Sequence, residues 1–238
     1  MNRQIVSAAC GLWLGLAGTV PGALAQGAEP VVVVELYTSQ GCSSCPAADA
    51  YLARLADQPG VLPLALHVDY WDYIGWADSF AQAKFTDRQR AYAAAAGSRT
   101  IYTPQMVVNG VDLAVGSDAV LVDGQIRRHR EAAARVALQV TRTGTTLAIS
   151  AQALVEVPGP LLVQLVRYTP SETVAIERGE NAGKTVIYRN IVTSWQQVGS
   201  WSGVGDLRLT VPAPGSAPLV VIVQTEGAGP ILAAASLR

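Results

Sequence analysis

The first regular pattern in the chain is a short apolar run. Residues 31–37, VVVVELY, are almost continuously apolar and β-branched, which predicts a buried parallel strand covered on both faces. Apolar residues then recur at helical spacing from 42 to 56, and Pro59-Gly60 ends that helix. A second apolar run, 61–69, predicts the next strand. The three elements together predict a βαβ unit with a right-handed crossover.

The pattern changes at residue 136. Before it, 70–97 reads as a helical insertion, Asn109-Gly110 between valine-rich segments indicates a hairpin, and 117–135 predicts a closing helix. After it, short alternating strands follow one another as far as Leu237 between Gly- and Pro-rich turns, about eight of them. We therefore expect an α/β domain over 29–135, with a central mixed sheet flanked by helices. A small all-β, sandwich-like domain is expected over 136–238.

The first 25 residues have the features of an export signal. A short positive start with Arg3 precedes a small-residue apolar stretch, and Ala23-Leu24-Ala25 fits a signal-peptidase site. A membrane anchor is the alternative, but glycines and a proline interrupt the stretch and no Lys/Arg cluster follows it. The pattern predicts cleavage near Ala25 and a periplasmic or secreted protein.

Charge and hydropathy exclude several classes of partner. The formal net charge is −1, and it becomes −2 when the +1 of Arg3 leaves with the signal. Nothing in this balance indicates nucleic acid or anionic lipid, and the basic residues 127–135 suit the solvated end of a helix. No later stretch is long enough in apolar residues to span a bilayer.

The cysteines indicate redox chemistry. Cys10 lies in the predicted signal, so the exported chain keeps only Cys42 and Cys45. A C-x-x-C bridge closes a very short loop and constrains the unfolded chain little, which makes it a poor structural staple. A cysteine at a helix N-terminus has a lowered thiol pKa, and Pro46 suits the first helical turn. We expect Cys42 to form mixed disulfides with protein or small-molecule thiols and Cys45 to resolve them.

Two other readings of the cysteine pair stay open. Two thiolates with His67 or His129 could bind copper or zinc, although structural zinc normally needs four ligands and there is no second C-x-x-C. The bridge could also be structural, in a binding or scaffold module. The redox reading implies no metal and no cofactor apart from the Cys42-Cys45 disulfide, and hydroxyl donors at Ser43 and Ser44 would tune its potential.

Four separated motifs carry a resemblance to a known family. VELYTSQGCSSCPAAD, HVDYWDYIGW, TPQMVVNG and RGENAGKT together resemble the bacterial domain-of-unknown-function family 1223, exported proteins of thioredoxin-like fold. The resemblance covers almost all of the chain after the signal. It implies a cis proline at Pro104, after Thr103, with the preceding backbone beside the sulfurs. A trans proline at the start of a strand is the alternative.

Further residues are candidates for the same site. Glu35 is a lone acid in a strand expected to be buried, so we expect a raised pKa and a role in moving the proton of Cys45. A carboxylate held by local hydrogen bonds is the alternative. In the aromatic segment 67–80, Asp69 and Trp71 could line a substrate groove together with Ser43, Ser44 and Pro46, or the rings could pack the segment onto the sheet.

Overall fold

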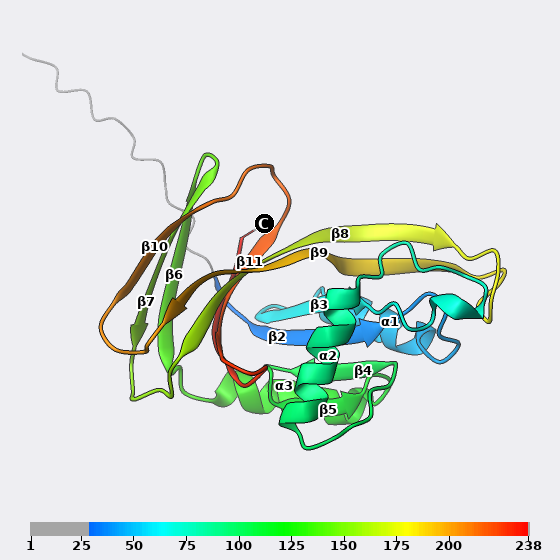
Figure 1. Ribbon diagram of the computed structural model, residues 1–238, viewed down its shortest axis with the longest axis horizontal. Coiled ribbons are helices and arrows are strands. Elements are labelled where there is room, and N and C mark those ends of the chain that lie inside the picture. Colours follow the sequence, from blue (N-terminus) through cyan, green and yellow to red (C-terminus); the bar gives the residue numbers. More distant parts are fainter. Residues whose placement is uncertain (1–28, 238) are drawn as a thin grey trace, which may run out of the picture.

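The computed structural model describes residues 29–237. The predicted signal, its cleavage site near Ala25 and Cys10 lie outside the described residues. The described chain forms a nine-stranded mixed sheet, helices on both of its faces, and a separate three-stranded antiparallel sheet at one end of the molecule (Figure 1). Among the helices of residues 29–237, none combines the length and the apolar character that a membrane span requires.

The first half of the chain follows the predicted order of elements. Its elements are β1 (Glu29–Pro30), β2 (Val32–Thr38), α1 (Pro46–Leu55), β3 (Val61–His67), the 3-10 helix η1 (Asp72–Ile74), α2 (Ala83–Ala95), β4 (Gln105–Val108), β5 (Asp112–Val115) and α3 (Ala119–Glu131). β2 pairs with β3 in parallel and with β4 antiparallel, and β5 pairs antiparallel with β4. The hairpin prediction is confirmed: Asn109 and Gly110 both have positive φ, of 52° and 72°.

The second half of the chain consists of strands. They are β6 (Val136–Thr143), β7 (Thr146–Ala153), β8 (Leu161–Ala175), β9 (Thr185–Trp201), β10 (Leu207–Pro212), β11 (Leu219–Thr225) and β12 (Ile231–Leu237). Only β6, β7 and β10 form the separate sheet. The large sheet has the order β1-β12-β11-β8-β9-β3-β2-β4-β5, because β9 lies parallel to β3 through the pair Ala65 and Ile191.

This arrangement joins the expected all-β unit over 136–238 to the sheet of the first half of the chain. A sandwich is present, since apolar residues of β6, β7 and β10 share a core with one part of the large sheet, including Leu165 and Val221. However, one of its two layers continues into the sheet of the first half. The physical reason is the length of β8 and β9, which have 15 and 17 residues, whereas a strand usually has about 5–6. β9 reaches from the sandwich to α1, and β8 runs beside it (Figure 1).

Two more cores hold helices on opposite faces of β2. Val34 and Leu36 pack with α1 and α3 on one face, whereas Val33 and Tyr37 pack with α2 on the other. Side chains of a strand alternate between its faces, so neighbouring residues of β2 point to different helices. This alternation decides which acidic residue lies near the cysteines.

Candidate functional site

Cys42 and Cys45 form a disulfide at the end of β2, with Cα atoms 5.4 Å apart. Helix α1 begins at Pro46, and Cys45 is its N-cap residue. The expected start at Cys42 is therefore wrong, because residues 42–45 form a turn in which the Cys45 N–H donates to the Cys42 carbonyl at 3.2 Å. The positive end of the helix lies nearest Cys45, and Cys42 precedes it by three residues.

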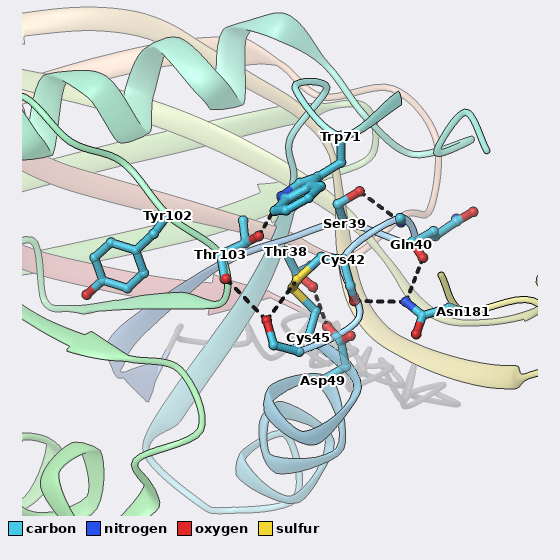
Figure 2. Close-up of a disulfide and its surroundings, with 12 residues drawn as sticks. Thr38, Ser39, Gln40, Cys42, Cys45, Asp49, Trp71, Tyr102, Thr103 and Asn181 are labelled. Atoms are coloured by element: carbon cyan, nitrogen blue, oxygen red, sulfur yellow. Dashed lines mark hydrogen bonds between the residues drawn. A yellow bond between two sulfur atoms is a disulfide. The ribbon is translucent and has the colours of Figure 1, made fainter. Parts of the chain in front are cut away.

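The disulfide is covered, whereas the residues between its cysteines are not. Cys42 is 1% and Cys45 0% exposed, and Ser43 and Ser44 are both exposed. The Ser44 Oγ lies 3.4 Å from the Cys42 Sγ and donates a long hydrogen bond, 3.5 Å, to the Thr103 carbonyl (Figure 2). The site thus brings Cys42, Ser44 and Thr103 together, although Thr103 is 59 residues from Ser44.

Thr103 also contacts the aromatic segment. The bond between Thr103 and Pro104 is cis, as the resemblance implies. The Trp71 Nε1–H donates to the Thr103 Oγ1 at 2.7 Å, and a Cβ built on Gly41 would lie 3.3 Å from the Trp71 Cβ (Figure 2). Trp71 therefore covers the loop just before Cys42. Trp71 also packs against the core that holds α2, and its place in a substrate groove stays a prediction.

Asp69 does not share this position. The Thr86 Oγ1 of α2 donates to the Asp69 Oδ1 at 2.6 Å, so Asp69 holds the beginning of the helical segment against the end of β3. Pro46 lies directly behind Cys45 as the first residue of α1. Its missing N–H suits the first helical turn, as the sequence predicts.

Glu35 is fully buried on the α2 face of β2. Its carboxylate accepts hydrogen bonds from the Arg88 Nε and Nη2 at 2.7 and 2.8 Å, from the Tyr92 hydroxyl at 2.7 Å and from the Tyr37 hydroxyl at 2.9 Å. Such a two-pronged, charge-assisted pair fixes a carboxylate strongly. Because Cys45 lies at the start of α1, on the opposite face, the geometry favours the alternative of a carboxylate held by hydrogen bonds.

Asp49 is a buried acid on the side of the cysteines. It lies one helical turn after Cys45, it is 4% exposed, and its Oδ1 accepts from the Thr38 Oγ1 at 2.8 Å (Figure 2). Its Oδ2 is buried and has no hydrogen-bond partner among residues 29–237. Burial raises the pKa of Asp49 to about 7, against the lowering effects of His67 and of the Thr38 hydrogen bond.

The position of Asp49 on the apolar face of α1 is a feature of the sequence that indicates a buried acid. Ala48, Leu52 and Leu55 mark the apolar face of α1, and an acid four residues after Cys45 falls on the same side of the helix. A carboxyl group on an apolar helical face is an exception that calls for a functional or hydrogen-bonding explanation. The prediction of a proton-transfer role was made for Glu35, the lone acid in β2.

The two histidines are each paired with an aspartate. The His67 Nδ1 lies 2.7 Å from the Asp78 Oδ2, and the His129 Nε2 lies 2.7 Å from the Asp112 Oδ2. The side chains of His67 and Asp78 are completely buried. His129 lies in the last turn of α3. Across residues 29–237, no three His, Cys, Asp or Glu side chains gather in a way that could hold a metal ion.

The second half of the chain reaches the disulfide through Asn181. Its buried Nδ2 donates to the Gln40 carbonyl at 2.9 Å and to the Cys42 carbonyl at 2.8 Å (Figure 2). The Lys184 Nζ donates in turn to the Asn181 Oδ1 at 2.8 Å. Both residues belong to the motif RGENAGKT, between β8 and β9. No local pattern predicts this contact, because 139 residues separate Asn181 from Cys42.

Comparisons with known proteins match a family and, among solved structures, include the two described here. The family described as "Protein of unknown function (DUF1223)" matches residues 33–224. An X-ray crystal structure of a protein from Agrobacterium tumefaciens is similar, with 33% identity, a TM-score of 0.74, and coverage of 88% of this chain and 95% of that one. HBP35 of Porphyromonas gingivalis matches at 13% identity with a TM-score of 0.64, over 87% of this chain and 74% of that one. The search of curated proteins found no match.

Proposed function

The chain belongs to the DUF1223 family, whose function is unknown, and we propose that it is a thioredoxin-like thiol–disulfide oxidoreductase. The observation that carries the proposal is the position of the Cys42–Cys45 disulfide. It lies between the end of β2 and the start of α1, with the backbone of Thr103 beside it. A two-residue loop at a helix N-terminus is the setting in which thiolates are stabilised and disulfides exchange.

The order of elements supports a thioredoxin-like assignment. β2, the cysteine pair, α1, β3, α2, Thr103-Pro104, the β4–β5 hairpin and α3 follow one another as that layout requires. HBP35, at its low identity, adds a likeness of fold alone. The chemistry is argued from the residues of the site.

The proposed reaction exchanges one disulfide for another. The thiolate of a dithiol partner attacks the Cys42 Sγ, the bond to Cys45 breaks, and the Cys45 sulfur takes the electron pair and a proton. The partner's second thiolate then attacks its own mixed disulfide and releases Cys42 as a thiolate, so the protein is reduced and the partner oxidised. The Ser44 hydroxyl, 3.4 Å from the Cys42 Sγ, can donate to that thiolate. The reverse sequence oxidises the protein.

Asp49 is the proposed acceptor and donor of the Cys45 proton. It is the buried acid one turn beyond Cys45, and its pKa of about 7 lies where an acid–base group is most effective at neutral pH. Glu35 is left a structural role, because its oxygens already accept four hydrogen bonds.

A partner must uncover Cys42 before it can react. The exposed residues of the site are Ser43 and Ser44, whereas Trp71 covers the loop in front of Cys42. We propose that the segment around Trp71 moves when protein or small-molecule thiols bind. The proposed setting is the periplasm or the exterior, reached through a signal cleaved near Ala25, because disulfides persist in such compartments.

One observation favours a second candidate. The bridge is almost completely buried and its loop is held by Asn181, which would also suit a binding or scaffold module with a structural disulfide. Such a module would bind partners without exchanging thiols. The two candidates differ in turnover, which is directly measurable.

Exchange by the mature protein tests the proposed function. We expect residues 26–238 to accelerate insulin reduction by dithiothreitol, or the oxidation of a reduced unfolded protein. Cys42→Ser should reduce the rate to the uncatalysed value, because the attacked sulfur is gone. Circular dichroism of the variant controls for folding. Wild-type rates equal to those of Cys42→Ser in both assays would identify the binding module instead.

A further inference from the structure

Two buried polar atoms near the disulfide lack partners. Among the described residues, neither the Asp49 Oδ2 nor the His67 Nε2 makes a hydrogen bond. Leaving a buried polar atom without a partner destabilises the folded state, so such atoms are rare and call for an explanation. The mechanism above uses Asp49 and leaves His67 without a role.

Strand register places these two groups on one face of the sheet. His67 of β3 pairs with Thr38 of β2, and paired residues of parallel strands point to the same face, with the strands about 4.8 Å apart. Thr38 donates to the other oxygen of Asp49. The imidazole therefore stands beside the residue that holds Asp49, underneath α1. His67 lowers the pKa of Asp49.

The His67 ring is fixed in one orientation. Asp78 contacts its Nδ1, and the rings of Phe80 and Tyr188 lie at 5.2 and 4.9 Å between centroids. The Asp78 carboxylate also accepts from the backbone N–H groups of Gln40 and Phe80, at 2.8 and 2.9 Å. Because a carboxylate accepts, the Nδ1 carries a hydrogen, and the Nε2 is left to take up or release a proton.

The charged and titratable groups that face Asp49 come from three other elements. His67 on β3 lowers its pKa, Asp78 on the segment after η1 raises it, and Tyr188 on β9 has a pKa raised by burial and by these two aspartates. Thr38 on β2 contributes a neutral hydroxyl. Of these side chains, the imidazole has a buried nitrogen without a hydrogen-bond partner among the described residues.

We propose that Asp49 and His67 form a proton relay for Cys45, with Asp78 orienting the imidazole. This inference rests on the proposed exchange function. When a mixed disulfide on Cys42 is resolved, the Cys45 thiol gives its proton to the Asp49 carboxylate, and a shift of the two side chains into hydrogen-bond contact lets the His67 Nε2 share it. The Cys45 thiolate attacks the Cys42 sulfur, the new disulfide forms, and the partner leaves as a thiolate. His67 is a positioning residue, since it acts through Asp49.

The test is the pH dependence of this resolution step. The mature protein carrying a glutathione mixed disulfide on Cys42 releases glutathione at a rate measurable by stopped flow from pH 5 to 9. In His67→Gln, we expect the midpoint of the rate profile to move upward by about half a pH unit or more, because the imidazole that lowers the pKa of Asp49 is gone. His129→Gln, on α3, is the matched control and should keep the wild-type midpoint.

A double-mutant cycle separates the relay from a merely structural effect. In an Asp49→Asn background, His67→Gln should change the profile no further, because the group through which it acts is absent. A wild-type midpoint in His67→Gln, or an undiminished shift in the Asn background, would overturn the relay. Loss of glutathione release from the wild type itself would instead overturn the proposed function.

Nuclear magnetic resonance covers the case in which His67→Gln does not fold. In the folded wild type, labelled with ¹³C, the Asp49 carboxyl carbon and the His67 ring carbons are followed from pH 4 to 9. A shared proton makes both signals report the same two titration steps. Independent single titrations, with exchange activity intact, would refute the relay alone.

Discussion

Cys45→Ala should accumulate covalent adducts on Cys42 when the reduced protein meets oxidised glutathione. The Cys42 thiolate attacks the glutathione disulfide, and no second thiol remains near it to resolve the product. Mass spectrometry of the intact protein should show one glutathionyl group per chain. Peptide analysis should place that group on Cys42.

The reciprocal variant is the control for this trapping. Cys42→Ser keeps Cys45, which is 0% exposed, lies at the N-cap of α1 and has Pro46 behind it. We expect it to stay unmodified over the period in which Cys45→Ala reacts completely. Equal modification of both variants, or of neither, would mean that Cys42 is not the attacking sulfur.

Asp49→Asn should make the oxidised protein more stable at pH 8 by about 4 kcal/mol. The folded protein holds Asp49 with a pKa of about 7, against an ordinary value of 3.8. The native state therefore binds the proton more tightly than the unfolded chain. The contribution of Asp49 to the free energy of unfolding is therefore highest below pH 4 and falls by up to about 1.4 kcal/mol per pH unit until pH 7, where it levels off.

Urea denaturation of both oxidised proteins between pH 4 and 8 measures this difference. The asparagine variant lacks the falling segment, so the two curves should meet near pH 4 and separate steadily above it. Asp57→Asn replaces an exposed carboxylate just after α1 and should keep the wild-type slope. A constant difference between wild type and Asp49→Asn at every pH would contradict the raised pKa of Asp49.

The sequence predicted those elements whose structure depends on residues close together in the chain. The apolar run of β2, the helical spacing of α1 and the Asn109-Gly110 turn each act within a few residues, and the structure has all three. The long hairpin of β8 and β9 was not predictable in this way. Pro170 reads as a break, yet it lies inside β8, and pairing of β9 with β3 joins residues 126 positions apart, Ala65 and Ile191.

The residues of the candidate site likewise include some that the sequence predicted and some that it did not. The cysteine pair and its neighbours followed from spacing, and Thr103-Pro104 followed from the resemblance. The sequence favoured Glu35 as the acid near the cysteines because β2 is apolar on both faces. Such a strand does not show in its sequence which face meets the cysteines. Strand register places His67 and Thr38, the partner of Asp49, side by side. Asn181 reaches Cys42 from a loop 139 residues later in the chain. Neither relation can be recognised from the spacing of neighbouring residues.

The reduction potential of the Cys42–Cys45 disulfide tests the central claim most directly. The mature protein is equilibrated with glutathione and dithiothreitol buffers of known potential, and its reduced fraction is counted by alkylation and mass spectrometry. The proposed function predicts a potential above roughly −300 mV, within reach of biological thiols. A potential below about −300 mV, together with no exchange activity, would show that the bridge is structural.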